Sequence, residues 1–478
     1  TTRGRNSVTE GRIPRQGKVQ NWSQLVANGR TPRHQEMRAI VLDLFEMALE
    51  AVDPGACVGR HITRAEDALR IGDRQFSLGE IQRIVIVGGG KASAAMAAKV
   101  VEILPEVRMV GAISVPNSLE NLPTLPSAIQ VFPSAHPVPD ENSQAAALAI
   151  LDLVENATSQ DLVIALFSGG ASALLVAPAP PVTLGDLQEM NRVLLRCGAS
   201  IQEFNTVRKH VSIFKGGNVA RRCAHAPLAS LVISDVIGNP LDVIASGPTV
   251  PDESTFGDCL EIVEKYEIAD RLPVSVRERL AAGARGEIPE TPKAGDSCFD
   301  TTTTLLAGSV ADAACTIKTY AQDAGWPCQY VTSQFQGEAR DQGARFWSTF
   351  SLAGLHTGCN IFLHSGELTV TIAGRGTGGR NQEMLLAAAS KVPPVPPVVV
   401  LSAGMDGIEG NSPAAGAMID NGTIARAKKA RLSPQEFLDQ NDSYHFFEFI
   451  GDAVVTGLTG TNVNDLTITI AWGNSTDD

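Results

Sequence analysis

The first segment that could bind a ligand consists of a predicted strand, a glycine turn and a lysine. In Val87–Met96 (VGGGKASAAM), Lys91 directly follows Gly88, Gly89 and Gly90. The hydrophobic run before the glycines predicts a strand, and the alanine-rich run after them predicts a helix. The first turn of a helix has unpaired backbone N–H groups that attract anions. We therefore expect Lys91 and the three glycines to bind phosphate, with a purely structural turn as the alternative.

The same arrangement occurs a second time. Ser168, Gly169 and Gly170 follow the hydrophobic run 162–167 and precede a short helical segment with a further hydroxyl group. We expect this turn to bind phosphate as well, although such turns are also used for packing alone in α/β proteins.

A basic segment comes next. Asn205–Ala220 (NTVRKHVSIFKGGNVA) contains Arg208 and Lys215, which are seven residues apart and would share one face of a helix. A solvated basic helix is the usual explanation for such clustering. Because the chain as a whole is acidic and the segment ends in a glycine pair, we expect Lys215 and Gly216 to contact phosphate.

Two carboxylates are candidates for metal binding or proton transfer. Asp235 directly follows the hydrophobic run 229–234, and Asp242 lies in the loop after it. A carboxylate at the end of a strand can hold Mg²⁺ or act as a general base. A turn or cap role is the alternative.

The second half has one sharp signal, the segment Gly374–Glu383 (GRGTGGRNQE). Arg375 and Arg380 flank Gly378 and Gly379 at the start of a predicted helix. Guanidinium groups pair strongly with carboxylates and phosphates. We expect a mobile glycine loop whose arginines and exposed amides clamp an oxyanion.

The elements that position these residues alternate between strands and helices. Strands predicted at 81–87, 110–115, 129–133, 162–167 and 229–234 end in glycine or polar residues, as expected for a parallel sheet with its site at the carboxyl ends of the strands. A chain of 478 residues exceeds the usual size of one domain. We place a domain boundary in the Pro- and Gly-rich stretch 272–297, which gives a basic, poorly ordered leader (1–34), a Rossmann-like domain (35–285) and a second α/β domain (286–478).

Composition narrows the function classes. The net charge of −13 disfavours nucleic acid and anionic membranes as partners, and no apolar run is long enough to span a bilayer. The eight cysteines are scattered, as in a reducing compartment. We expect a cytoplasmic protein, with mitochondrial import by the basic leader as the alternative. The sequence does not decide whether the protein forms a homo-oligomer.

These segments, together with AHPVPD, SAGMDG, NDSYHFF and GLTGTNVND, resemble in order the signatures of the type 2 glycerate kinases, whose carboxyl-terminal unit is called the MOFRL domain. The resemblance extends from about Arg38 to Trp472. The motifs near the carboxyl terminus are similar to those of the animal members of the family. The resemblance implies two α/β domains, the first Rossmann-like, with the active site in the cleft between them.

The resemblance also implies phosphoryl transfer from ATP to D-glycerate with a divalent cation, here Mg²⁺. It places the catalytic residues at Lys91 and Arg380 and matches Asp235 to the Ser-Asp motif of the family. We further expect the substrate to contact a set of polar residues from both halves of the chain: His136, Arg208, Asn381 and Asp406. Thr377, Ala171, Met405 and Pro413 depart from the family pattern.

Two other functions are open. The first is an NAD(P)H-dependent hydroxypyruvate reductase, because related chains have that name. The glycine turn is a poor dinucleotide fingerprint, however, and no acidic residue ends the next strand, where Ser114–Asn117 lies. The second is a non-catalytic metabolite-binding protein, which the departures from the family pattern favour.

Overall fold

The computed structural model describes residues 17–474, and these form two compact α/β units. Residues 54–309 make up the first, called here the parallel-sheet unit. The residues up to Asp53 and from Val310 onward make up the second, called here the mixed-sheet unit. The chain leaves the parallel-sheet unit between residues 309 and 310, whereas the sequence analysis placed this boundary near residue 285. The predicted boundary stretch 272–297 instead contains helix α11 (Val274–Ala284), which packs against α7 and α10 inside the parallel-sheet unit.

The parallel-sheet unit contains six parallel strands in the order β6-β5-β4-β7-β8-β9. This order and the parallel pairing confirm the Rossmann-like prediction. The strands are β4 (Arg83–Gly89), β5 (Met109–Pro116), β6 (Ile129–Ser134), β7 (Asp161–Phe167), β8 (Leu228–Ile233) and β9 (Thr302–Gly308).

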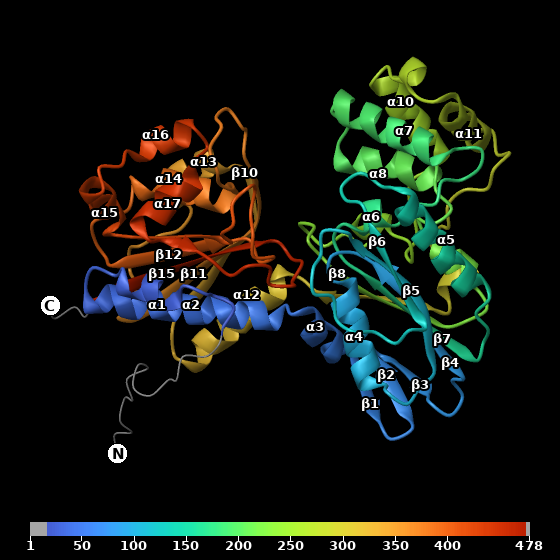
Figure 1. Ribbon diagram of the computed structural model, residues 1–478, viewed down its shortest axis with the longest axis horizontal. Coiled ribbons are helices and arrows are strands. Elements are labelled where there is room, and N and C mark those ends of the chain that lie inside the picture. Colours follow the sequence, from blue (N-terminus) through green and yellow to red (C-terminus); the bar gives the residue numbers. More distant parts are fainter. Residues whose placement is uncertain (1–16, 475–478) are drawn as a thin grey trace. The chain divides into compact units, whose positions relative to one another are not determined.

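Helices and a small antiparallel sheet complete this unit. Val85 and Val87 of β4 belong to a core that includes buried residues of α5 and α9, while α4 packs against β4 and β5. Four of the helices, α7, α8, α10 and α11, form a separate cluster with its own apolar core (Figure 1). The elements are α3 (Pro54–His61), β1 (Ile62–Ala65), β2 (Ala68–Ile71), β3 (Arg74–Ser77), α4 (Ser93–Ile103), α5 (Glu141–Glu155), α6 (Ala171–Leu174), α7 (Leu184–Cys197), α8 (Ile201–His210), α9 (Asn218–Arg222) and α10 (Phe256–Lys265).

The mixed-sheet unit is built on six strands in the order β10-β11-β15-β12-β13-β14, in which only the β10–β11 pair is parallel. The α1, α2 and α12 helices lie on one side of this sheet, and the helices from α13 to α17 lie on the other (Figure 1). The strands are β10 (Cys328–Glu338), β11 (Gly358–Thr369), β12 (Val398–Ala403), β13 (Gly416–Asp420), β14 (Ala453–Val454) and β15 (Asp465–Gly473).

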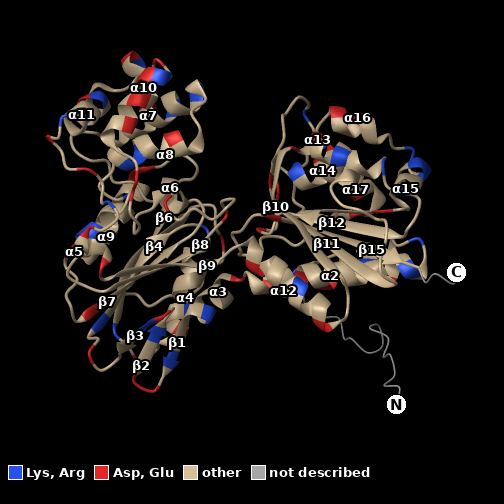
Figure 2. Ribbon diagram, turned by 180° about the vertical axis from the view of Figure 1, so that it is seen from behind, with Lys and Arg blue, Asp and Glu red and all other residues tan. Residues whose placement is uncertain are grey.

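The helices of this unit are α1 (Trp22–Ala27), α2 (Pro32–Ala51), α12 (Val310–Asp323), α13 (Ala339–Arg345), α14 (Arg380–Ala389), α15 (Thr423–Lys429), α16 (Pro434–Asp439) and α17 (Ser443–Ile450). The strands of both six-stranded sheets carry charged residues only at or near their ends (Figure 2). This distribution leaves apolar strand centres, which the helices cover. None of the helices between residues 17 and 474 has the length and apolar character needed to cross a membrane.

The amino-terminal residues belong to the fold of the mixed-sheet unit. Helix α2 packs against β12 and β15, although the sequence analysis placed residues 35–53 in the other domain. The prediction of a disordered leader is wrong for residues 17–34, which include α1 and a hydrogen bond from Gln20 N–H to Val455 O of 2.8 Å. The rest of the predicted leader, residues 1–16, lies outside the described residues.

A buried ion network fixes these helices. Arg38 of α2, with no exposed side-chain surface, donates to Asp420 at 2.7 Å and to Asp452 at 2.8 Å. Arg426 of α15 donates to the same two carboxylates at 3.0 and 2.7 Å. Two arginines therefore balance two buried aspartates. The network joins the amino-terminal helix to β13, α15 and the loop after α17.

We predict that Arg38→Met lowers the free energy of unfolding of the mixed-sheet unit by about 3–5 kcal/mol, because it leaves buried carboxylate charge uncompensated. Urea titration followed by tryptophan fluorescence measures this unit selectively, since all four tryptophans belong to it: Trp22, Trp326, Trp347 and Trp472. Arg345→Met, at an exposed position of α13, is the control and should change little. Equal stability of Arg38→Met and the wild type would contradict the importance of the network.

Candidate functional site

Two glycine turns meet at the centre of the parallel sheet. From β4 the chain proceeds to β5 and β6 on one side and then returns to β7, which pairs with β4 on the other side. The turn after β4 holds Gly90 and Lys91, and the turn after β7 holds Ser168–Gly170. They therefore flank the point at which the strand order reverses, where ligands bind in open α/β sheets.

The two turns are in direct contact. The Lys91 N–H donates to Gly169 O, and the Ala92 N–H donates to Ser168 Oγ, each at 3.0 Å. A Cβ atom on Gly90, whose φ is +131°, would lie 2.2 Å from Ser168 Oγ. One on Gly88 would lie 2.0 Å from Leu166 O. The close approach of the turns thus requires glycine at both positions.

His136 joins this group from the loop after β6. Its ring lies so near Gly170 that a Cβ there would be 3.3 Å from His136 Cδ2. Desolvation of the ring and the charge of Lys91 both lower the pKa of His136. The structure therefore brings together, at the second glycine turn, Lys91, which was predicted to bind phosphate, and His136, which was predicted to contact the substrate.

Two buried basic side chains contact α6, the short helix that follows the second glycine turn. Lys215 Nζ donates to Ser172 O at 2.8 Å and to Leu175 O at 2.9 Å, and Arg208 Nη2 lies 3.4 Å from Ser172 O. Arg208 is 9% exposed and Lys215 is 2% exposed. Burial lowers the pKa of Arg208 to about 10, and burial together with the Arg208 charge lowers the pKa of Lys215. Neither forms an ion pair with any described residue.

The glycine pair after Lys215 does not offer its amides to a ligand. The Gly216 N–H donates to Ser246 O at 2.9 Å, and the Gly217 N–H donates to Gly247 O at 2.7 Å. This pairing is a correction to the expectation that Gly216 contacts phosphate. It instead holds the segment 245–247, in which Ala245 and Ser246 have positive φ angles of 55° and 59°. Such angles are unfavourable for residues with a side chain, so the surrounding contacts must impose them.

The two candidate metal ligands differ in their surroundings. Asp235 follows β8 at the edge of the sheet where the glycine turns lie, and it is partly exposed. Asp242 accepts a hydrogen bond from Lys209 Nζ at 3.3 Å, and Lys209 also pairs with Asp252 at 3.2 Å. No cluster of three or more ligating side chains occurs among residues 17–474. Because Mg²⁺ is often held by one carboxylate, waters and phosphate oxygens, Asp235 fits that ion better than Asp242.

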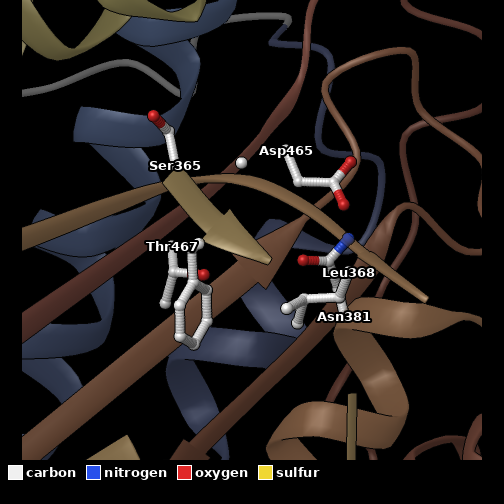
Figure 3. A pocket seen from close by; sticks show the side chains of 7 residues that line it. Ser365, Leu368, Asn381, Asp465 and Thr467 are labelled. Carbon is white, nitrogen blue, oxygen red and sulfur yellow. The ribbon is translucent and has the colours of Figure 1, made fainter. Parts of the chain in front are cut away.

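In the mixed-sheet unit, Arg380 begins α14 and is paired with carboxylates. It binds both oxygens of Asp465, at 2.5 and 2.8 Å, and donates to Glu367 at 2.8 Å. Although its burial acts in the opposite direction, these carboxylates raise the pKa of Arg380. A narrow space beside this pair, with no room for a water-sized molecule, is lined by Asp465, Asn381 and five neighbours (Figure 3). Arg375 is exposed and has no partner among the described residues.

The glycine loop before Arg380 is fixed by its neighbours. Asn441 Oδ1 accepts from the Ala373 and Gly374 amides at 2.8 and 2.9 Å, and Asp442 Oδ1 accepts from the Thr377 amide at 2.8 Å. The Gly378 amide donates to Asn411 Oδ1 at 2.8 Å. The expectation of a loop with exposed amides was therefore wrong for these positions. Its glycines allow close packing, since a Cβ on Gly376 would lie 2.3 Å from Asp442 Cβ.

Glu409 is a residue that the sequence analysis missed. Its carboxylate accepts from the Asn381 and Gln382 amides at 2.7 and 2.9 Å, so it occupies the amino terminus of α14. A Cβ on Gly379 would lie 2.4 Å from Glu409 Cγ. Burial, with Asp465 nearby, raises the pKa of Glu409 to about 8. The amides at the start of α14 are thus satisfied by the protein itself, and only the single Glu in the GMDGIEG turn could have suggested it.

The last two predicted substrate residues lie around this region. Asn381 is buried and donates its side-chain amide to Glu409 at 2.9 Å, while its Oδ1 accepts from Ser402 Oγ at 2.7 Å. The Asp406 and Asp465 carboxylates both lie within 3.5 Å of the position that a Cβ on Gly404 would take. Asn381 therefore serves the packing of the helix start, and the surroundings of Arg380 are acidic.

Two family profiles match the chain. A domain of unknown function, DUF4147, matches residues 40–281, and the MOFRL family matches residues 360–465. Both agree with the signatures found in the sequence.

Known proteins match nearly the whole chain. The D-glycerate 2-kinase of Thermotoga maritima is 34% identical over 91% of this chain and 98% of its own length. The human glycerate kinase is 35% identical over 88% of this chain and 91% of its own length. A protein of Agrobacterium vitis, provisionally named a hydroxypyruvate reductase, is 37% identical over 90% of this chain and 93% of its own length. A solved structure of a Thermotoga maritima glycerate kinase aligns with a TM-score of 0.78 and 34% identity, covering 90% of this chain and 98% of the other.

We predict that Glu409 makes the mixed-sheet unit less stable as the pH rises. Between about pH 5 and pH 8, its carboxyl group ionises in the unfolded chain but keeps its proton in the folded one, since the folded pKa is about 8. The free energy of unfolding should therefore fall by up to about 1.4 kcal/mol per pH unit from this group.

Tryptophan-detected urea titrations from pH 5.5 to 8 would measure that slope. The slope should be shallower in Glu409→Gln and unchanged in Glu436→Gln, which alters an exposed acid on α16. Equal slopes in wild type and Glu409→Gln would refute the prediction.

Proposed function

The chain belongs to the family of glycerate kinases with a MOFRL domain, and from this premise we propose that it transfers the γ-phosphoryl group of ATP to D-glycerate. The name of the Thermotoga relative specifies the 2-hydroxyl group as the acceptor. We extend this regiochemistry to the present chain, so the product is 2-phosphoglycerate.

One observation in the structure carries the proposal: Lys91, His136, Arg208 and Lys215, from separate segments, gather at the turn Ser168–Gly170 and at α6, which follows it. Phosphoryl transfer requires little covalent chemistry from a protein. It depends on placing the reactants and on positive charge around the transferred group. Lys91 and Arg208 are the cations that supply this charge, because burial and a neighbouring cation lower the pKa values of His136 and Lys215.

Each residue has a distinct task in this mechanism. The turns Gly88–Gly90 and Ser168–Gly170 hold the phosphates of ATP, and the Lys91 ammonium neutralises charge on the transferred phosphoryl group. Asp235 has two alternative roles: it receives the proton of the attacking hydroxyl group, or it would hold Mg²⁺ together with phosphate oxygens. When bound, Mg²⁺ would balance the charge of the phosphates.

We also propose a role for the arginines of the mixed-sheet unit. Arg375 is exposed and has no partner among the described residues, so its guanidinium group is available to an anionic ligand. The ion pair with Asp465 holds Arg380 in a fixed orientation, and a ligand anion would have to compete with that carboxylate. Asp406 lies beside the same pair and serves the local charge balance.

The reductase alternative has less support. A dinucleotide site of this fold needs an acidic residue at the end of the second strand to bind the ribose. Here β5 ends at Pro116 and continues into Asn117. The provisional name of the Agrobacterium relative is the observation in its favour.

The assay for the proposed function follows ADP released from ATP, with and without D-glycerate, and identifies the product by ³¹P NMR. We expect release that depends on D-glycerate and a phosphomonoester at the 2-position. A 3-phosphoglycerate product would overturn only the regiochemistry. Oxidation of NADH by hydroxypyruvate without any glycerate-dependent release of ADP would establish the reductase instead.

We predict that Lys91→Met lowers kcat by about two to four decades, because removing this charge costs roughly 3–5 kcal/mol of transition-state stabilisation. The control is Lys99→Met, which removes a lysine from α4, the helix that follows Lys91. Lys99 pairs with Glu102 at 2.6 Å, and its replacement should leave kcat unchanged. Near-normal turnover of Lys91→Met would exclude Lys91 from the reaction.

A further inference from the structure

The strongest unexplained feature of the parallel-sheet unit is the polar end of α8. Arg208 is nine-tenths buried, and its one hydrogen bond to a described residue is the 3.4 Å contact with Ser172 O. A guanidinium group has five N–H donors. The Phe204 ring, 4.6 Å from the guanidinium carbon, covers one of its faces but does not satisfy those donors. Burying such a charge without an anionic partner is costly.

A second side chain on the same face of α8 also has free donors. Asn205 is 3% exposed and lies three residues before Arg208, so the two are neighbours on the helix surface. Its Oδ1 accepts from Ser246 Oγ at 3.1 Å, but its Nδ2 donates to no described residue. Ser246 is in turn linked to Ser172 by a hydroxyl–hydroxyl bond of 2.9 Å.

The backbone at this place is held in an unfavourable conformation. Ala245 and Ser246 have positive φ angles, and the amides of Gly216 and Gly217 maintain that conformation by binding Ser246 O and Gly247 O. The result is a Ser246 hydroxyl group directed at both Asn205 and Ser172. Lys215 binds the carbonyl groups of Ser172 and Leu175 and so holds the backbone beside the Ser172 hydroxyl group in place. It is therefore a positioning residue here.

We propose that Arg208 and Asn205, with the Ser172 and Ser246 hydroxyl groups beside them, form the subsite that binds the carboxylate end of a small hydroxy acid. The inference rests on the proposed function and assigns the specificity for an acid to these residues. A planar guanidinium fork matches a carboxylate in a bidentate manner. The Asn205 amide donates to the same group, and the serine hydroxyl groups can bind the adjacent hydroxyl of the acid.

A carboxylate fits this place better than the phosphates of the nucleotide. The phosphates carry several charges and match the glycine turns, where Lys91 and His136 lie. On the α8 side, Arg208 contacts the Ser172 carbonyl group, and the linked Ser172, Ser246 and Asn205 side chains are neutral. One guanidinium fork with neutral hydroxyl and amide groups nearby suits the single negative charge of a carboxylate, and Lys215 is already bound to two carbonyl groups.

The test compares Arg208→Gln and Asn205→Ala with wild type in steady-state kinetics and in calorimetric titration with D-glycerate alone. We expect Arg208→Gln to raise KM and Kd for D-glycerate by about 30- to 1000-fold and Asn205→Ala by about 5- to 30-fold. In both variants, KM for ATP should stay within about threefold of the wild-type value. The preference of the wild type for D-glycerate over the uncharged D-glyceramide should largely disappear in Arg208→Gln.

Arg279→Gln is the matched control, because this partly buried arginine on the neighbouring α11 donates to His210 O at 2.8 Å. Its KM for D-glycerate should equal that of the wild type. If Arg208→Gln does not fold, Arg208→Lys keeps the charge but loses the fork and should still raise KM for D-glycerate.

A rise in KM for ATP without a change for D-glycerate would overturn the proposal and assign Arg208 to the nucleotide. Unchanged constants for both ligands would overturn it too. Calorimetric binding of D-glycerate that depends on Arg208 would support the subsite even if the wild type released no ADP, in which case only the proposed kinase reaction would fail.

Discussion

Positive charge buried without matching negative charge is the constraint on which the parallel-sheet unit depends. Arg208 and Lys215 lie close enough for the one to lower the pKa of the other, and neither has a carboxylate partner among the described residues. The glycine turns bring Lys91 into contact with the turn that precedes Ser172. A bound anion would balance the buried charge, which links the packing of the unit to its proposed function.

The mixed-sheet unit solves the same electrostatic problem in the opposite way. Its potential ligand-binding groups are satisfied from within: the Glu409 carboxyl group accepts from the amides at the start of α14, and Asp465 occupies the fork of Arg380. The NDS sequence, which looked like a plain family signature, fastens the glycine loop through Asn441 and Asp442. This region is therefore a rigid, charge-balanced structure, and Arg375 is its exposed cation with no described partner.

The sequence predicted the repeated strands and turns well because hydrophobic runs bounded by glycine are local signals. The strands that became β4 to β8 were found, and so was the turn at Gly90; Gly88 lies within β4 instead of the turn. Long-range pairing was harder. Helix α2 looked like the start of the first domain, but its partner Asp420 lies 382 residues away.

In the candidate site, too, local motifs were predictable and long-range contacts were not. Lys91, His136 and the serine–glycine turn were found from short motifs, and the structure places them together. Gly216, the exposed amides before Arg380 and Asn381 were misassigned because their hydrogen-bond partners, Ser246, Asn441 and Glu409, come from distant segments. Spacing along the chain shows which amides could bind a ligand but not which ones the fold already uses.

Hydrogen–deuterium exchange on the whole chain tests the central claim most directly, since it locates where the ligands act. With a non-hydrolysable ATP analogue, Mg²⁺ and D-glycerate, we predict slower exchange in peptides that cover residues 88–92, 168–176 and 205–217. Exchange that stays unchanged in all three segments at saturating ligand would contradict the account, because the uncompensated charges around Ser172 would then have no ligand to balance them.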